Sequence, residues 1–448
     1  MPQTFQPPPG TRDFFPADMA LRRHIEDTWR KVSLRHGFLE VDGPTFEYLD
    51  LYKVKSGDEI VSQLFHFETR ADQSGKTDTF ALRPEFTPTL ARMVAAKANA
   101  LPRPIKWFSI PRCYRAERQQ KGRLKEFIQW NVDMLGGETP EAQRQFDLET
   151  AALALDCLRE FGLTNADTQL LWNDRTLVEH LFQIANIAKP HYAFAFHLLD
   201  RLAKFTPDQR TKQYAENNIP PHEQTFFENL AAGLDPLTPT FWQNLTPTTD
   251  PATYANTIQA TQQSIESTLT LMGFPNHAKY TPSIVRGLAY YTGFVWEIAA
   301  TKSDHRAIAG GGRYDKLIEM FGGPPLPATG FGMGDVVLAN LLAESNKLPT
   351  TTSAIDIYII NALATNDEAT KLLATLRTAG LAAITSYKTT KNIGKLLQDA
   401  NTSGAKLALI LAPTEFERGL LKLKNLTTRE EKEIPLAEVL PQCLAASR

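Results

Sequence analysis

The sequence has few cysteines and little net charge, and each of these features excludes certain classes of protein. Its three cysteines, Cys113, Cys157 and Cys443, form no CxxC pair. This scarcity predicts neither a disulfide framework nor a zinc site, and it is typical of a reducing compartment. The formal net charge is only −2. No overall field therefore attracts nucleic acid, and any such partner must bind local basic patches.

Long apolar segments are also absent. No run of 18 apolar residues occurs, and residues 1–16, MPQTFQPPPGTRDFFP, show neither the apolar core nor the cleavage pattern of a signal peptide. We therefore expect a cytoplasmic protein without a membrane partner. The 448 residues are 42% hydrophobic and 22% charged, which is ordinary for globular proteins and suggests about three domains.

The most informative stretch is residues 111–136, PRCYRAERQQKGRLKEFIQWNVDMLG. Its first sixteen positions hold six basic residues and two acidic ones. Gly122 favours a turn, so the pattern predicts a strand, a long basic loop and a second strand. Alternate side chains of that second strand share one face. We therefore expect Arg115, Gln129 and Asp133 to meet in one pocket.

Such a pocket would combine a cation, an amide and a carboxylate. These groups suit a substrate that carries a phosphate at one end and an amine at the other. The plainer alternative is a basic hairpin on the solvated surface. The polar residues on one face of an otherwise apolar strand favour the pocket, because buried polar groups need partners.

Two further segments carry charged or aromatic residues in apolar surroundings. In LRPEFT, Glu85 lies between an expected strand and an expected helix, where it could bind an ammonium group or simply favour the helix start. In VRGLAYYTG, Arg286 needs either an anion or a buried carboxylate beside it. Tyr290 and Tyr291 could hold a planar substrate or belong to the core.

Two glycine-rich segments, AGGGRYD at 309–315 and GFGMGDVVL at 330–338, let a ligand approach the backbone closely. Tight turns or close helix packing would explain them equally well, and neither is a P-loop. Arg115 and Arg286, far apart in the chain, suit attack on the α-phosphate of ATP. Fixed cations stabilise the charge that develops in that transition state.

The pattern of elements divides the chain. We expect one α+β unit over 1–344 with a mostly helical insertion at about 174–253, a linker at 345–353, and a small α/β domain with a mixed sheet over 354–448. Within the first unit, the local patterns predict helices over 19–36, from 88 past 100 and over 139–161, and a strand over 61–69.

Taken in order, these motifs resemble the histidyl-tRNA synthetases, which are class II aminoacyl-tRNA synthetases. The resemblance is carried by GTRDFFP, LRPEFT, CYRAERQQKGRLKEFIQWNVDMLG (motif 2), VRGLAYYTG, GGGRYDKL and GFGMG (motif 3). In the last domain, TTKNIGKLLQDANTSGAK and GLLKLKNLTTREEKEIPL resemble the family's anticodon-binding domain. The resemblance implies an antiparallel sheet flanked by helices, and a homodimer formed through residues 21–51.

It also implies a reaction: Mg²⁺-ATP activates L-histidine to histidyl-adenylate, and histidine then passes to the 3′ end of tRNA-His. The catalytic residues implied at the α-phosphate are Arg115 and Arg286. The implied histidine-binding residues are Glu85, Phe86, Thr87, Gln129, Asp133, Tyr290 and Tyr291. The implied ATP-binding residues are Arg115, Glu117, Arg123, Arg286, Gly332 and Gly334. The number of metal ions is not implied.

The sequence departs from the family's pattern at several positions. Val337 stands where motif 3 normally has an arginine, Asp133 where glutamate is usual, and Phe86 where glycine is common. We hypothesise that Arg123 or Arg313 takes over part of the role of the missing motif 3 arginine.

Three other functions stay open. A histidine-sensing regulatory subunit of ATP phosphoribosyltransferase would explain Val337, but such subunits generally lack an anticodon domain. Another class IIa synthetase is opposed by the Tyr290–Tyr291 pair and Asp133. A tRNA-binding module without catalysis would leave Arg115 and Arg286 without a purpose.

Overall fold

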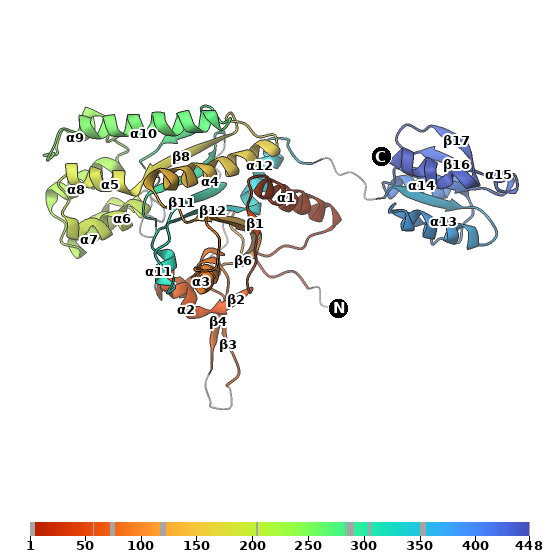
Figure 1. The fold of residues 1–448 in the computed structure, drawn as a ribbon, viewed down its shortest axis with the longest axis horizontal. Coiled ribbons are helices and arrows are strands. Elements are labelled where there is room, and N and C mark those ends of the chain that lie inside the picture. The colour runs from red at the N-terminus through yellow and green to blue at the C-terminus, as the bar shows by residue number, and fades with distance from the viewer. Residues whose placement is uncertain are drawn as a thin grey trace. The chain divides into compact units, whose positions relative to one another are not determined.

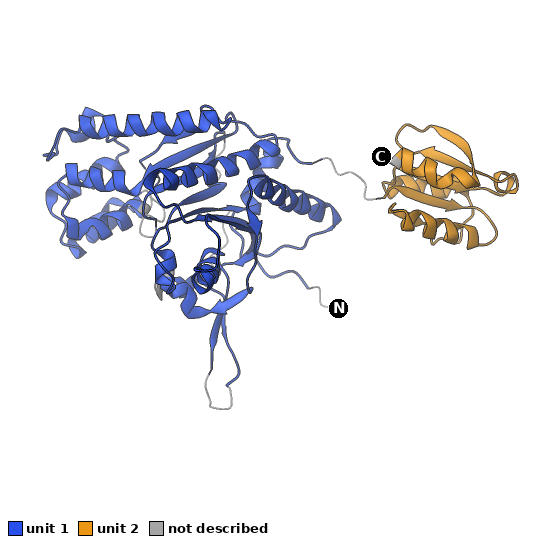
Figure 2. Ribbon diagram, in the orientation of Figure 1, with its two compact units in different colours: residues 1–349 blue, residues 350–448 orange. Residues whose placement is uncertain are grey.

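The computed structural model describes residues 5–56, 58–71, 77–116, 122–202, 205–282, 284, 291–302, 306–349 and 355–447. The chain forms two compact units, residues 1–349 and 350–448 (Figure 2). Each unit has its own sheet and its own hydrophobic core. Among the described helices, none combines the length and the apolar character needed to span a membrane.

The first unit is built on a nine-stranded sheet in the order β1-β5-β7-β12-β11-β10-β8-β9, with β6 paired to β7. Neighbours are antiparallel except for β1–β5 and β8–β9, which are parallel pairs at the two ends. The expected antiparallel sheet is therefore confirmed for its central strands. The strands are β1 (Leu39–Glu40), β5 (Ile105–Ser109), β6 (Arg112–Tyr114), β7 (Glu126–Leu135), β8 (Thr168–Asp174), β9 (Ala278–Tyr280), β10 (Phe294–Ala300), β11 (Ala309–Arg313) and β12 (Ala328–Gly334).

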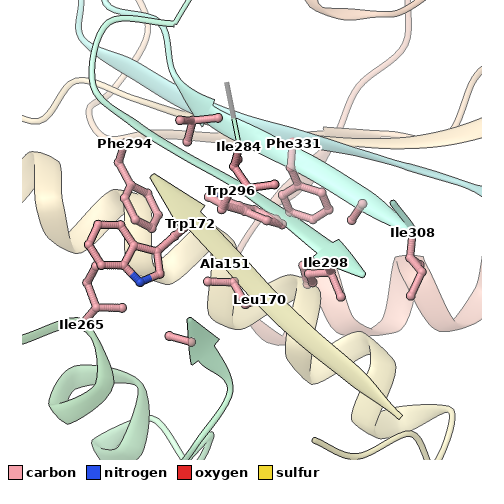
Figure 3. Close-up of a cluster of buried hydrophobic side chains, with 14 of the residues drawn as sticks. Ala151, Leu170, Trp172, Ile265, Ile284, Phe294, Trp296, Ile298, Ile308 and Phe331 are labelled. Atoms are coloured by element: carbon pink, nitrogen blue, oxygen red, sulfur yellow. The ribbon is translucent and has the colours of Figure 1, made fainter. Parts of the chain in front are cut away.

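One face of this sheet is covered by the helices α1 (Pro16–Arg35), α4 (Pro140–Glu160) and α12 (Asp335–Glu344), which share a hydrophobic cluster with it. The strands direct large apolar side chains to this face (Figure 3). Trp130 stacks on Trp29 of α1 at 5.9 Å between ring centroids. Each such buried ring contributes about 1.5–3 kcal/mol of transfer free energy.

The opposite face carries small and polar residues. The strand alternation places Gln129, Asn131 and Asp133 of β7 beside Gly330 and Gly332 of β12. One end of this face is covered by α3 (Thr87–Lys97) and α11 (Leu317–Met320), which pack against it in a second cluster. The sheet thus has one face for stability and one that leaves room for a ligand.

A small three-stranded sheet, β2-β4-β3, belongs to the same unit (Figure 1). It consists of β2 (Phe46–Tyr48), β3 (His66–Glu68) and β4 (Thr79–Leu82), with α2 (Leu49–Ser56) and the 3₁₀ helix η1 (Asp58–Gln63) beside it. The expected strand over 61–69 is wrong in its first part. Ile60 and Val61 pack against Leu49 and Tyr52 on a helical turn, so tertiary packing overrides their β propensity.

Two of the expected helices, over 19–36 and 139–161, are confirmed as α1 and α4. The helix expected to run past Ala100 instead ends at Lys97. Leu101 precedes Pro102, and the residue before a proline disfavours helical backbone.

The insertion is mostly helical, as expected, and its helices gather at one side of the unit (Figure 1). It comprises α5 (Arg175–Ile184), η2 (Lys189–His191), α6 (Tyr192–Arg201), α7 (Pro207–Glu216), α8 (Pro221–Ala231) and α9 (Pro239–Trp242), followed by the long α10 (Ala252–Leu271). Aromatic rings form its centre, with Phe226 in contact with Phe182, Phe227 and Phe241.

The second unit has the mixed sheet that the sequence predicts. Its order is β14-β13-β15-β16-β17, parallel from β14 to β15 and antiparallel from β15 to β17. The strands are β13 (Ile357–Asn361), β14 (Ala383–Thr385), β15 (Leu407–Leu411), β16 (Leu420–Asn425) and β17 (Glu431–Pro435). The helices are α13 (Asp367–Thr378), α14 (Ile393–Thr402), α15 (Pro413–Glu417), η4 (Leu436–Glu438) and α16 (Val439–Ser447).

Candidate functional site

The basic stretch folds as two antiparallel strands, β6 and β7, with Cys113 opposite Phe127. Gly122 has φ +76°, which is the left-handed backbone conformation expected of a glycine in a turn. The two strands predicted on either side of the basic loop are therefore confirmed. Loop residues 117–121, including the predicted ATP contact Glu117, lie outside the described residues.

A cavity of about 260 Å³ lies between the base of this loop and the strands β10, β11 and β12. Five residues predicted from the sequence line it: Arg115, Arg123, Gln129, Gly332 and Gly334. The hairpin and motif 3 therefore border the same cavity, but Asp133, which we expected to share a pocket with Arg115 and Gln129, is not among its lining residues. Arg286 and Tyr290 lie outside the described residues, so their part in this site stays a prediction.

Arg115 is fixed at the wall of this cavity. Its Nε donates to the carbonyl of Pro84 at 3.2 Å, and its guanidinium carbon lies 4.9 Å from the centre of the Phe127 ring. The contact with Pro84 uses one of the five N–H donors that an arginine offers. Arg115 therefore joins the hairpin to the LRPEFT segment.

Glycines on β12 make room for the polar side chains of β7. A Cβ added to Gly332 would lie 2.2 Å from Gln129 Nε2, and one added to Gly330 would lie 2.3 Å from Asp133 Oδ1. Both distances are too short for non-bonded atoms, so a side chain at either position would displace its neighbour. The glycine pattern is thus explained by the space that Gln129 and Asp133 need.

Asp133 lies farther along β7 than Gln129 and is only 2% exposed. Its Oδ1 accepts a hydrogen bond from the Tyr314 hydroxyl. The Tyr291 ring lies over β11, where a Cβ on Gly312 would be 3.0 Å from its Cδ1. Burial, together with the charges of Glu85, Asp133 and Glu297, raises the pKa of Tyr291. The Tyr291 hydroxyl therefore stays protonated and can donate a hydrogen bond at this end of the site.

Phe86 and Thr87 both lie in the interior. The Phe86 ring is 0% exposed and packs with Leu90 and Leu317 in the cluster under α3 and α11. Thr87 is the first residue of α3 and is 9% exposed. The ring of Phe86 thus supports the segment that carries Glu85, and a contact of either residue with histidine stays a prediction.

Arg313 does not compensate for Val337, so that part of the hypothesis is wrong. Its Nε and Nη2 donate to Asp147 at 3.1 and 2.8 Å, and its Nη1 donates to Asp315 at 3.1 Å. With 6% of its surface exposed, this arginine is a structural partner of two carboxylates. Asp315 in turn accepts from the Thr292 hydroxyl at 2.8 Å, which anchors the chain just after Tyr291.

The N-terminal segment GTRDFFP braces the site. The Gly10 carbonyl accepts from the Lys125 N–H at 2.8 Å. Arg12 Nη2 donates to Asp335 Oδ2 at 2.6 Å, and Asp335 Oδ1 accepts from the Ile128 N–H at 2.9 Å. The segment therefore ties the base of the basic loop to the start of α12.

Two charged cavity residues escaped the sequence reasoning, namely Glu297 on β10 and Arg306 before β11. Glu297 is the one charged residue in the apolar strand FVWEIAA, the same signal that singled out Asp133. Arg306 lies in a connection, where nothing in the sequence distinguishes it from a surface arginine.

The described residues contain no group of three or more His, Cys, Asp or Glu side chains arranged to hold a metal ion. Glu297 is the one carboxylate in the described lining of the cavity. Mg²⁺ that arrives with a nucleotide usually binds one or two carboxylates together with phosphate oxygens. Glu297 therefore fits a metal ion carried by a phosphate substrate.

Each of the two units matches a known protein family. The family model described as Histidyl-tRNA synthetase matches residues 10–335, and the model described as Anticodon binding domain matches residues 354–445. A protein from Opitutus terrae named histidine–tRNA ligase is 41% identical over 97% of both chains. One of the same name from Leptospira biflexa is 34% identical over 96% of this chain and 95% of its own.

A solved structure shows the same fold. The chain is similar to the crystal structure of histidyl-tRNA synthetase from Nostoc sp. PCC 7120, with a TM-score of 0.75 and 21% identity. The match covers 99% of this chain and 100% of that one.

Proposed function

Since the chain belongs to the histidyl-tRNA synthetase family and is a histidine–tRNA ligase, we propose that the cavity beside Arg115 binds ATP and that histidine binds next to it, at Asp133 and Tyr291. The observation that supports this most directly is the shared strand β7. It carries Gln129 in the cavity wall and Asp133 two alternations farther on. The two substrates would thus lie end to end along one strand.

The ATP end is supported by charge and shape. Arg115 and Arg123 line the cavity with Gly332 and Gly334. The glycines give a floor against which the adenine ring can lie, and the Phe127 ring offers a stacking surface. Arg115, joined by Arg286 as the family resemblance implies, stabilises the charge on the α-phosphate. Glu297 would hold the Mg²⁺ that accompanies ATP.

The histidine end is supported by hydrogen-bonding groups. A carboxylate at Asp133 can accept from an imidazole N–H, while Tyr291 and Tyr290 would line the ring. Glu85, with Thr87 and Gln129, would hold the amino group. A site whose buried polar groups match the imidazole rejects amino acids that leave those groups unpaired.

The reaction has two steps. The histidine carboxylate attacks the α-phosphorus of ATP, and pyrophosphate leaves to give histidyl-adenylate. A ribose hydroxyl at the 3′ end of tRNA-His then attacks the histidyl carbonyl, and AMP leaves. Neither step needs a protein nucleophile, because orientation and fixed charge supply the acceleration.

Residues 1–344 would form the catalytic domain, with the helical insertion at about 174–253, and residues 354–448 would read the anticodon of tRNA-His. The linker would be 345–353. Lysines near the start of α14, such as Lys391 and Lys395, suit contacts with tRNA phosphates.

A homodimer is supported by an apolar face on the small sheet. Phe46, Tyr48 and Phe67 are 47%, 54% and 44% exposed, and they surround Phe80 with ring centroids 4.9–6.0 Å away. Exposed aromatic clusters of this kind mark interaction surfaces. A second copy of the chain would cover the face around a two-fold axis.

ATP–pyrophosphate exchange with the purified protein tests this function. Exchange should depend on L-histidine and should be negligible with glycine, proline, threonine and other amino acids. Histidine binding without any exchange would instead favour the regulatory-subunit function.

A further inference from the structure

Arg306 lies in the connection between β10 and β11, three residues before Ala309. It lines the same cavity as Arg115 and Arg123. Glu297 is the one acidic side chain among the described lining residues, so arginines outnumber carboxylates in a small space. Several guanidinium groups that line one small cavity offer the donors that a multiply charged anion needs.

The three arginines come from different walls. Arg115 is joined to Pro84, on the side of the LRPEFT segment. Arg123 comes from the basic loop. Its neighbour Gly122 lies close to α12, since a Cβ added to Gly122 would be 3.6 Å from Val337. Arg306 enters with Ala307 and Ile308 from the β10–β11 connection. Val337 itself brings no charge to the α12 side.

We propose that Arg306, together with Arg123, binds the β- and γ-phosphates of ATP and the pyrophosphate that leaves. This inference rests on the proposed function and deepens it. Arg115 stands beside the amino-acid end, so it meets the α-phosphate, and the outer phosphates fall to the other two arginines. A guanidinium donates to two phosphate oxygens at once, which a neutral side chain at position 337 cannot do.

The residues that line the cavity make a contact between Arg306 and the adenine ring the weaker alternative. A neutral ring needs flat or apolar surfaces, which the glycine floor and Phe127 already supply. Cation stacking on a ring also does not require several arginines in one cavity.

The test compares Arg306→Ala with Lys302→Ala. Lys302 belongs to the same connection, is 74% exposed in its side chain, and lies 3.5 Å from Asp167, so its replacement removes an equal charge away from the cavity. In histidine-dependent ATP–pyrophosphate exchange, Arg306→Ala should raise the KM values for ATP and for pyrophosphate about tenfold or more. The KM for histidine should change less than about twofold, and Lys302→Ala should behave as the parent protein.

A second measurement locates the contact on the nucleotide. The inhibition constant of AMP should be the same for the parent protein and Arg306→Ala, because AMP has no outer phosphates. An equal weakening of ATP and AMP would overturn the proposal, as would KM values equal to those of Lys302→Ala.

Separate control experiments distinguish a folding defect from a loss of function. Arg306→Lys keeps a cation and should recover part of the affinity for ATP, while thermal melting checks that each variant is folded. If Arg306→Ala does not fold, Arg306→Lys and Arg306→Gln replace it in the test. A KM for ATP that is raised in Arg306→Gln but largely recovered in Arg306→Lys, with the inhibition constant of AMP unchanged in both, supports the proposal. A parent-like KM for ATP in Arg306→Gln overturns it. If the parent protein shows no exchange, the proposed function itself has failed.

Discussion

Gly330 and Asp133 lie directly opposite each other across the β7–β12 ladder, and a Cβ on Gly330 would be 2.3 Å from Asp133 Oδ1. The glycine is therefore part of the space in which the carboxylate stands. Under the proposed function, this relationship would link motif 3 to amino-acid recognition as well as to ATP.

Replacing Gly330 by alanine should displace the Asp133 carboxylate and weaken histidine binding about tenfold or more, with a much smaller effect on ATP. Substrate KM values in pyrophosphate exchange measure both. Gly334→Ala is the matched comparison, since its added Cβ meets no atom within 4 Å. If the two substitutions change the KM for histidine equally, the close contact between position 330 and Asp133 is not the cause.

Replacing Asp133 by alanine should raise the KM for histidine about 100-fold, because the imidazole N–H loses its charged acceptor. Tyr314→Phe removes only the hydroxyl that donates to Asp133 and should have a smaller effect in the same direction. Loss of ATP binding in parallel with histidine binding would contradict the assigned role of Asp133.

The dimer proposal predicts that Tyr48→Lys will separate the two copies. A charge placed in the aromatic cluster of β2, β3 and β4 would have to be buried in the interface, which is costly. Sedimentation velocity should show a dimer for the parent protein and a lighter species for the variant. A parent protein that is monomeric at micromolar concentration would show that this face does not join two copies.

Stability should depend on pH through His36 at the end of α1. Its Nδ1 lies 3.1 Å from Glu149 and its Nε2 lies 3.2 Å from Asp156, and hydrogen bonding to Glu149 raises the pKa of His36. A raised folded-state pKa gives stabilisation that is fully present below the unfolded value of about 6.5 and is lost as pH rises through the higher folded value.

His36→Gln should therefore lower the free energy of unfolding by on the order of 0.5–1 kcal/mol at about pH 5.5, and by less at about pH 8.5. Denaturant titrations at the two pH values give the difference. A deficit that is the same at both values would show that the charge of His36 adds nothing.

Much of the fold and of the site could be predicted because the informative residues lie in regular elements. The alternation of Gln129 and Asp133 on a strand fixes their common face, and the glycines of β12 follow the same period. Glu297 on β10 carries a similar signal, a single charge in an apolar strand, but it was not predicted as a site residue, and its place in the cavity is clear only once β10 is seen beside β11.

Other parts depend on contacts that the sequence does not encode locally. Arg313 and Arg115 are both arginines beside glycine-rich or basic segments, yet Arg313 is bound by Asp147 of α4, 166 residues away. The turn at Val61 is helical because it packs on α2, despite its β-branched residues. Arg306 lies in a connection, where no periodicity indicates the direction of a side chain.

The most direct test of the whole account is the single-turnover rate of histidyl-adenylate formation in Arg115→Ala, measured beside Arg112→Ala. Arg112 begins β6, three residues before Arg115, but its side chain is 45% exposed and pairs with Glu126. We predict that Arg115→Ala slows adenylate formation at least about 100-fold while Arg112→Ala stays close to the parent rate. Equal rates for a folded Arg115→Ala and Arg112→Ala would contradict the placement of the α-phosphate in this cavity.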